Sequence, residues 1–183
     1  MPASSSLNLV HVVETLPPRG LEPVHWMLAT REPIDTAEQV EEVVDFYRAR
    51  WVIEKFFKAL KTGCAYEKRQ LESARTLVNA LAVFVPVAFR LLYLRALTHH
   101  TPRASARRLF TPAQLSVLRA TAKRRLPTRI TARQAFLAVA ALGGHIKNNG
   151  EPGWLVLGRG YEKLLYGEFI WKLAAREKDV INP

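Results

Sequence analysis

The sequence predicts an α/β segment at the N-terminus followed by an all-α region, so that the protein is mainly helical overall. Two short runs of β-branched and apolar residues, 7–13 (LNLVHVV) and 23–30 (PVHWMLAT), flank the turn-rich LPPRGLEP, which is typical of two strands joined by a loop. The later apolar stretches instead have helical length and carry helix start and stop signals. A chain of 183 residues can bury one good core or two small ones.

The first predicted helix begins after Thr36, which is followed three residues later by Gln39 in a capping-box pattern. It should run to about Lys61, because Gly63 is the kind of residue that commonly lies just past a helix end. A second long helix is expected over about 73–97.

The remaining helices carry the same signals. Thr111, with Pro112 at the first helical position, and Thr131 are each followed three residues later by a glutamine and predict two further helix starts. The helix from Thr131 should stop at the two glycines of 143–144. A loop rich in glycine and asparagine then leads to a last amphipathic segment over 154–175.

Positive charge is concentrated in the middle of the chain. The net charge is +11, and residues 73–150 contain 13 Lys or Arg and no acid, whereas the rest of the chain holds 14 Lys or Arg and 16 acids. Such asymmetry indicates a polyanionic partner, with nucleic acid favoured over a membrane surface. A basic surface that serves only solubility is the alternative that composition leaves open.

The most apolar stretch, 74–97, does not predict a membrane span. Its longest charge-free part, 76–89, is shorter than the roughly 20 residues that a bilayer requires, so we expect a buried helix here. The N-terminus lacks the pattern of a signal peptide, and the single cysteine, Cys64, suits a reducing cytosol. Because Cys64 follows a helix end, where the dipole disfavours a thiolate, we expect no nucleophile there.

The first predicted helix combines two surfaces. At about 100° per residue, the polar side chains of Tyr47, Arg50, Glu54, Lys58 and Lys61 form one narrow stripe. An apolar flank beside it is expected to be buried and consists of Phe46, Ile53, Phe56, Phe57 and Leu60. The stripe could be a solvated surface whose i,i+4 ion pairs contribute about a few tenths of a kcal/mol each. It could instead serve phosphate chemistry, with Glu54 for a divalent metal and the basic residues for phosphate oxygens.

The spacing of four stripe residues resembles a known signature. Tyr47, Arg50, Glu54 and Lys61 follow the intervals of the YREK signature of bacterial insertion-sequence transposases, in the IS-4 class and most closely of the Tn-5 type. The likeness extends upstream through HWMLATREPIDTAEQ and downstream through ALGGHIKNNGEPGWLVLGRGYEKL. It covers essentially the whole chain, but only the C-terminal portion of the family protein.

The resemblance implies a domain organisation and an activity. Residues 1–100 would be the C-terminal part of an RNase H-like catalytic core, and residues 101–183 a helical dimerisation domain. Members of the family cut and join DNA through a core whose Asp, Asp and Glu hold two divalent metals, Mg²⁺ or Mn²⁺. Glu54 stands where the catalytic glutamate stands, so it would be a metal ligand and a catalytic residue.

The resemblance also implies DNA contacts at the transposon end. Arg50 and Lys61 would hold phosphates, Tyr47 would hydrogen-bond a phosphate next to a flipped base, and Lys58 would be a further DNA contact. Trp26 lies 21 residues before Tyr47, the interval at which the family places the tryptophan that stacks on the flipped base. Such stacking is worth roughly 1–3 kcal/mol per base. The alternative for Trp26 is an ordinary core residue of a strand.

The sequence departs from the family in its carboxylates. Asp35, Asp45 and Asp179 do not correspond to the two catalytic aspartates, which lie far upstream in the family. One glutamate supplies too few oxygen ligands for an octahedral metal, and two-metal chemistry needs several converging carboxylates. We therefore expect a truncated cytoplasmic transposase that binds DNA, makes no membrane contact and is inactive alone.

Two alternatives remain open. One is a non-enzymatic regulator that dimerises with full-length transposase and inhibits it, and the other is a basic helical DNA-binding domain with a coincidental signature. The C-terminal helices would form a homodimer, or a heterodimer with the full-length enzyme. The apolar residues that could supply this contact, or in part the core, are Trp154, Leu155, Leu164, Leu165, Phe169 and Trp171.

Overall fold

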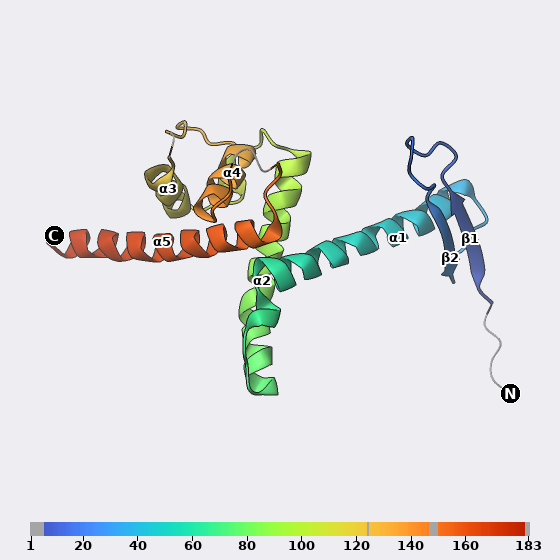
Figure 1. Ribbon diagram of the computed structural model, residues 1–183, viewed down its shortest axis with the longest axis horizontal. Helices are drawn as coiled ribbons and strands as arrows, with labels where there is room; N and C mark the ends of the chain where they lie inside the picture. The colour runs from blue at the N-terminus through green and yellow to red at the C-terminus, as the bar shows by residue number, and fades with distance from the viewer. Residues whose placement is uncertain (1–5, 124, 147–149, 182–183) are drawn as a thin grey trace. The chain divides into compact units, whose positions relative to one another are not determined.

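The computed structural model describes residues 6–123, 125–146 and 150–181 (Figure 1). By internal contacts the chain divides into two compact units, Met1–Glu54 and Lys55–Pro183. The resemblance to the family predicts a border between a catalytic-core part and a dimerisation domain at residue 100. The division by contacts is a different kind of border and does not test that prediction. The described residues form a two-stranded sheet followed by five α-helices, which confirms a mainly helical fold with strands at the N-terminus.

The first unit consists of a hairpin and a helix. Strands β1 (Asn8–Val13) and β2 (His25–Thr30) pair antiparallel, with Val10 opposite Leu28. Helix α1 (Ala37–Lys58) follows, and Figure 1 shows the hairpin beside the N-terminal part of this helix. The predicted capping box is present, because the Gln39 N–H donates to Thr36 Oγ1 at 3.3 Å and the Thr36 N–H donates to Gln39 Oε1 at 3.1 Å. The two strands and the first helix start are thereby confirmed.

The first unit buries little surface. Its core is the trio Val10, Leu28 and Val43, against which Trp26 and Tyr47 pack in half-buried positions. Alternation along the strands directs these residues to one face of the hairpin, and the other face exposes the apolar side chains of Leu9, Val13 and Met27.

The expected burial of the apolar flank of α1 is largely wrong. Phe46, Ile53 and Phe57 are exposed, whereas Leu60 is buried and Phe56 packs partly against the larger core. Within the first unit the two strands contact one side of α1 only, through Val43 and its neighbours, so they cover little of the flank. Helical periodicity alone gives the direction of a side chain but not whether another element lies there.

The second unit is entirely helical and has its own core. Besides the last residues of α1, its elements are η1 (Ala59–Gly63), η2 (Tyr66–Lys68), α2 (Ala74–His100), η3 (Ala106–Arg108), α3 (Pro112–Thr121), α4 (Ala132–Leu142) and α5 (Trp154–Ile181). Helices α3 and α4 and the turn η1 all pack on the N-terminal part of α5, and Figure 1 shows α3 and α4 on the same side of it. Phe136, Leu118, Leu157 and Leu164 are among its fully buried side chains.

The predicted helix starts in this unit are confirmed, whereas α2 ends at His100 and not near 97, and α5 ends at Ile181 and not at 175. Ser73 caps α2 by accepting a hydrogen bond from the Thr76 N–H, and Thr111 and Thr131 each form a complete capping box. Helix α4 ends at Leu142 with Gly143 as its C-cap, and the following residue, Gly144, has a φ of +93°, the left-handed conformation that favours glycine.

The predicted α-helix up to Lys61 is corrected by the structure. Helix α1 ends at Lys58, and residues 59–63 form a π-helical turn in which the Cys64 N–H donates to Ala59 O at 2.9 Å. The wider turn places Leu60, Gly63 and Cys64 in the core, and its backbone lies directly against α5. Lys61 therefore does not lie at the angle that an ideal α-helix would give it.

Three glycines bring backbones into direct contact. A Cβ atom on Gly158 would lie 1.7 Å from Gly63 O, and one on Gly160 would lie 1.9 Å from Val139 O. A Cβ atom on Gly143 would lie 1.9 Å from Val156 O. Helix α5 thus packs against η1 and α4 at a distance that no side chain other than hydrogen permits.

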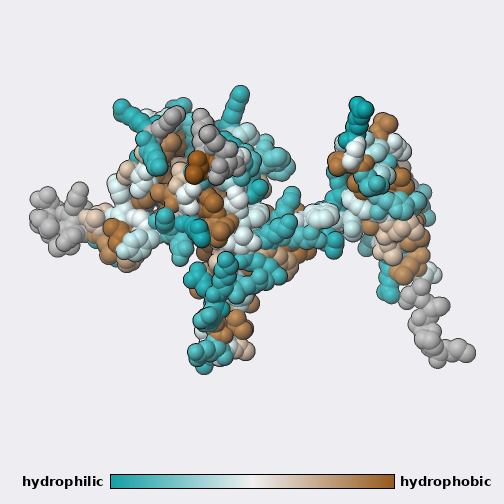
Figure 2. Space-filling model, viewed as in Figure 1, coloured by the Kyte–Doolittle hydropathy of each residue, from teal (hydrophilic) through white to brown (hydrophobic). Residues whose placement is uncertain are grey.

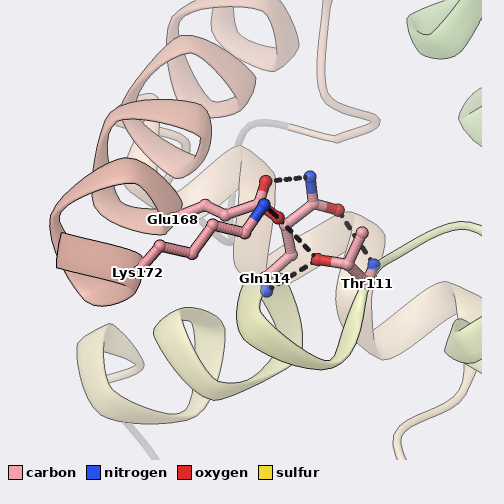
Figure 3. Close-up of polar contacts among 4 residues, drawn as sticks. All are labelled: Thr111, Gln114, Glu168 and Lys172. Atoms are coloured by element: carbon pink, nitrogen blue, oxygen red, sulfur yellow. Dashed lines mark hydrogen bonds and ion pairs between the residues drawn. The ribbon is translucent and has the colours of Figure 1, made fainter. Parts of the chain in front are cut away.

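A polar cluster joins α5 to the start of α3 (Figure 3). The buried carboxylate of Glu168 accepts hydrogen bonds from Thr111 Oγ1 at 2.8 Å and from Gln114 Nε2 at 2.6 Å, and it pairs with Lys172 at 2.9 Å. Thr111 and Gln114 are also the two residues of the capping box, so one network caps α3 and holds α5. The negative charge at a helix N-terminus is favourable for the helix dipole.

Helix α2 is buried over only part of its length. Ala88, Leu91 and Leu94 lie in the core, but Val78 and Val83 in the N-terminal half are exposed, and Figure 2 shows apolar residues at the surface there. The expected buried helix is therefore correct for the C-terminal half alone. Among the described residues α2 is the one helix long and apolar enough to cross a membrane, which by itself is weak evidence, because core helices can pass the same test.

Candidate nucleic-acid-binding site

Three predicted site residues share one face of α1. Tyr47, Arg50 and Glu54 are three and four residues apart, so their side chains lie above one another along the helix. Arg50 Nη2 is 3.3 Å from Glu54 Oε1, and the Arg50 guanidinium lies 5.3 Å from the centroid of the Tyr47 ring. The side chains of Arg50 and Glu54 are 54% and 41% exposed, which leaves both open to a ligand.

Strand β2 adds an aromatic ring to this face. Trp26 points to the same side of the hairpin as the buried Leu28, and its ring centroid is 4.8 Å from that of Tyr47 at an interplanar angle of 59°. Both rings are half-buried. A cleft of about 330 Å³, lined by residues of β2 and α1, borders Tyr47. The first unit therefore brings Trp26, Tyr47, Arg50 and Glu54 into one continuous set of contacts.

The remaining two site residues belong to the second unit. Lys58 is the last residue of α1 and is exposed. Lys61 lies in η1, where its Nζ is 2.9 Å from Glu67 Oε1. The pairing with Glu67 could not be predicted from an ideal helix, because it depends on the π-helical turn and on η2, which carries Glu67.

A two-metal centre does not fit the carboxylates of the described residues. No group of three or more His, Cys, Asp or Glu among them is placed to hold a metal ion, and Glu54 is already paired with Arg50. Asp45, on the same helix, pairs with Arg48 at 3.2 Å, and Asp179 lies among side chains outside the described set. The carboxylate of Glu54 supplies at most two of the six oxygen ligands that a Mg²⁺ ion requires.

Cys64 is unsuited to nucleophilic catalysis. The thiol is buried, and burial raises its pKa to about 11, with a smaller opposing effect of Arg69. A thiol with this pKa is almost fully protonated at neutral pH, so the expectation of no nucleophile at this position is supported.

Residues 12–84 of the chain match the family model of the transposase DDE domain. The matched range contains β2, α1, η1 and all six predicted site residues, and it ends inside α2. The match supports a DDE transposase relationship and, with it, DNA as the partner and a divalent metal as the cofactor of the family. The helical region beyond residue 84 lies outside the matched range.

Proposed function

We propose, on the premise that residues 12–84 are a segment of a transposase DDE domain, that the chain is the C-terminal portion of an IS-4-type enzyme and holds transposon-end DNA. The observation that carries this proposal is the contact set of Trp26, Tyr47, Arg50 and Glu54 within the matched segment. The net charge of +11 agrees with a polyanionic partner.

Each residue of the set has a role in this proposal. Arg50 presents a planar guanidinium that can donate two parallel hydrogen bonds to a phosphate, and Tyr47 donates its hydroxyl to the same backbone. Trp26 offers a ring face to a base taken out of the stack. Lys58 and Lys61 add phosphate contacts, and Lys61 exchanges its pairing with Glu67 for a phosphate oxygen.

Glu54 would be the one catalytic carboxylate that the chain supplies. Mg²⁺ or Mn²⁺ would bind there only together with carboxylates from another segment or another chain, since Glu54 alone does not fit either ion. We propose accordingly that this chain binds DNA and does not cleave it unaided. In the absence of the ion, the ion pair with Arg50 holds the Glu54 side chain in place.

Replacing Arg50 with glutamine should weaken binding to duplex DNA about tenfold to a hundredfold, because a charge-assisted hydrogen bond contributes about 1.5–3 kcal/mol. The slope of log affinity against log salt should fall by about one. Arg48→Gln is the matched control, because Arg48 is likewise an exposed arginine of the same helix paired with a carboxylate, Asp45, but does not belong to the contact set around Tyr47. Fluorescence anisotropy with a labelled duplex at several salt concentrations measures both effects.

Equal losses for the two variants would mean that the stripe is an ordinary basic surface. In the same samples with Mg²⁺ we expect no strand cleavage, and robust cleavage that Glu54→Ala abolishes would overturn the claim that the chain is inactive alone.

A second role follows from the exposed end of α5. Of the six apolar residues predicted for a dimer contact, Leu164 is fully buried and Trp154 packs against the core, so these two stabilise the unit itself. Phe169 and Trp171 are instead 58% and 47% exposed, but two residues apart on a helix they point to opposite sides. Phe169 lies on one side of α5 with the exposed Leu165 and Leu173, four residues before and after it, and these three form an apolar surface. Figure 2 shows apolar residues toward this end of the helix. We propose that this surface pairs with a second copy, or with full-length transposase in a regulatory complex.

The double variant Leu165→Ser, Phe169→Ser should shift the protein from dimer to monomer, because it removes two large apolar anchors from the same side of α5. Sedimentation velocity over a range of concentrations measures the shift. Leu137→Ser is the control, since Leu137 is an exposed apolar residue on α4. A wild-type chain that remains monomeric at all concentrations and does not bind full-length enzyme would remove this role.

A further inference from the structure

A cleft of about 660 Å³ lies within the second unit, between the end of α2, the start of α4 and the segment that leads into α5. This volume is in the range of small-molecule and cofactor sites. The residues of its wall that bear on the argument are Lys55, Arg95, Thr98, Arg133, Glu151 and Trp154. None of them belongs to the six residues predicted from the transposase signature.

Two arginines in the wall each form both a hydrogen bond and a contact with an aromatic ring. Arg95 Nη1 donates to Pro152 O at 3.1 Å, and its guanidinium lies 4.8 Å from the centroid of the Trp154 ring. The Arg133 guanidinium lies 5.4 Å from the centroid of the Phe136 ring and forms a two-point hydrogen bond with Glu151. The Arg95 guanidinium, fixed in this way by neutral groups, loses little conformational freedom when an anion binds.

Thr98 has a hydroxyl group without a partner. The residue is 5% exposed and lies in the wall of the cleft, and among the described residues no group forms a hydrogen bond with its Oγ1. Leaving a buried hydroxyl unsatisfied is costly, so such groups are uncommon in folded proteins. Because the Oγ1 atom itself has almost no accessible surface, a ligand oxygen in the cleft would satisfy it after the Thr98 side chain rotates about χ1.

The charges in the wall select an anion. Lys55, Arg95 and Arg133 face a single carboxylate, Glu151, and the hydrogen bonds from Arg133 lower the pKa of that carboxyl, which therefore remains charged at neutral pH. Further basic residues, Arg103 among them, are exposed on the segment that follows α2. A polymer with many phosphates can use this wider surface, whereas a single nucleotide cannot.

We propose that this cleft is a second phosphate-binding site, in which Thr98, Arg95, Arg133 and Lys55 hold a backbone phosphate of DNA. The identity of the polymer rests on the proposed function, but the phosphate site itself does not depend on the contacts around Tyr47. The carboxylate of Glu151 competes with the phosphate for Arg133.

Thr98→Val separates binding from folding. The variant removes the unsatisfied hydroxyl at nearly constant volume, so the melting temperature should stay the same or rise, while the affinity for a short DNA duplex falls about fivefold. Thr98→Ser should retain most of the affinity because it keeps the hydroxyl. A Thr98→Val protein that binds DNA as tightly as the wild type overturns the role of this hydroxyl.

Neutralising a basic residue of the wall and neutralising its carboxylate should change the affinity for DNA in opposite directions. Lys55→Gln should lower the affinity about threefold to tenfold and reduce the salt slope by about one, because one phosphate contact is lost. Lys123→Gln is the matched control, since Lys123 is an exposed lysine of the same unit outside the cleft wall. Glu151→Gln should raise the affinity by about threefold, because Arg133 no longer has a competing carboxylate.

Fluorine NMR of 5-fluorotryptophan-labelled full chain locates the contact. The chain has four tryptophans, of which Trp154 lines the cleft and Trp26 contacts Tyr47. A short duplex should shift the Trp154 resonance in the wild type and much less in Lys55→Gln. Shifts at Trp26 alone would overturn the cleft site and leave the proposed function intact. Shifts at Trp154 alone would support the cleft site and overturn the proposed binding of DNA around Trp26 and Tyr47.

The same NMR experiment is repeated with two small ligands, inorganic phosphate and a deoxynucleoside monophosphate. If either shifts the Trp154 resonance as strongly as the duplex does at equal phosphate concentration, the cleft takes a small phosphate and the assignment to DNA is wrong. If the duplex acts at much lower phosphate concentration, the assignment to a nucleic-acid backbone is supported.

Discussion

Gly158→Ala is expected to destabilise the helical unit by about 3 kcal/mol or more, the upper end of the usual cost of overpacking. The added Cβ atom would lie 1.7 Å from Gly63 O and 2.5 Å from Gly63 C, which are backbone atoms of the π-helical turn and cannot rotate away. Helix propensity predicts the opposite sign, because alanine is favoured over glycine by about 1 kcal/mol inside a helix. The steric cost exceeds this gain, so the net effect is destabilising.

The measurement is urea-induced unfolding followed by circular dichroism, and the control is Gly153→Ala. Nothing lies within 4 Å of a Cβ atom on Gly153, which precedes α5, so this variant should change the free energy of unfolding by no more than about 1 kcal/mol. A Gly158→Ala protein with an unchanged or higher midpoint would show that η1 and α5 do not pack as closely as described.

Glu168→Ala is expected to destabilise the same unit by about 2–4 kcal/mol. The substitution removes the acceptor of Gln114 Nε2 and Thr111 Oγ1 and leaves the buried Gln114 amide without that partner. It also removes a negative charge from the N-terminal end of α3. Glu162→Ala, at an exposed position on the same helix, is the matched control and should have little effect.

The stabilising contribution of Glu168 should also depend on pH. Burial raises the pKa of its carboxyl, but the hydrogen bonds from Lys172, Thr111 and Gln114 outweigh burial and lower the pKa in the folded protein overall. A lowered folded-state pKa means that the contribution is complete above the unfolded-state value of about 4.3 and is lost as the pH falls below it. Urea midpoints measured between pH 7 and pH 3.5 should therefore decline in the wild type and decline less in Glu168→Gln. Parallel declines would contradict the assignment.

Local signals predicted the secondary structure well, because capping acts between residues three positions apart. The boxes at Thr36, Thr111 and Thr131 and the stop at 143–144 need no knowledge of the tertiary fold. The π-helical turn over 59–63 could not be predicted in this way, since no capping signal marks it and its backbone packs against α5, nearly 100 residues later in the sequence.

The part of the candidate site that lies on α1 was predictable for the same reason, because its residues are only three or four positions apart. The i,i+4 pairing of Arg50 with Glu54 follows from helical geometry, and the closeness of Trp26 to Tyr47 was implied only by the family resemblance. The basic cleft and the unpartnered Thr98 hydroxyl depend on where α2 meets α4. Nothing in the sequence around this threonine of an apolar helix indicates that it lies in the wall of a cleft.

The glycine contacts of α5 have an effect far from where they occur. Because only hydrogen fits at Gly158 and Gly160, the helix has a single permitted axial rotation, and a slip by one residue would turn every side chain by about 100°. The part of α5 beyond these glycines carries Leu165 and Phe169, so the same constraint sets the direction in which these two side chains point. Two positions without side chains thus orient the apolar surface proposed to meet a partner.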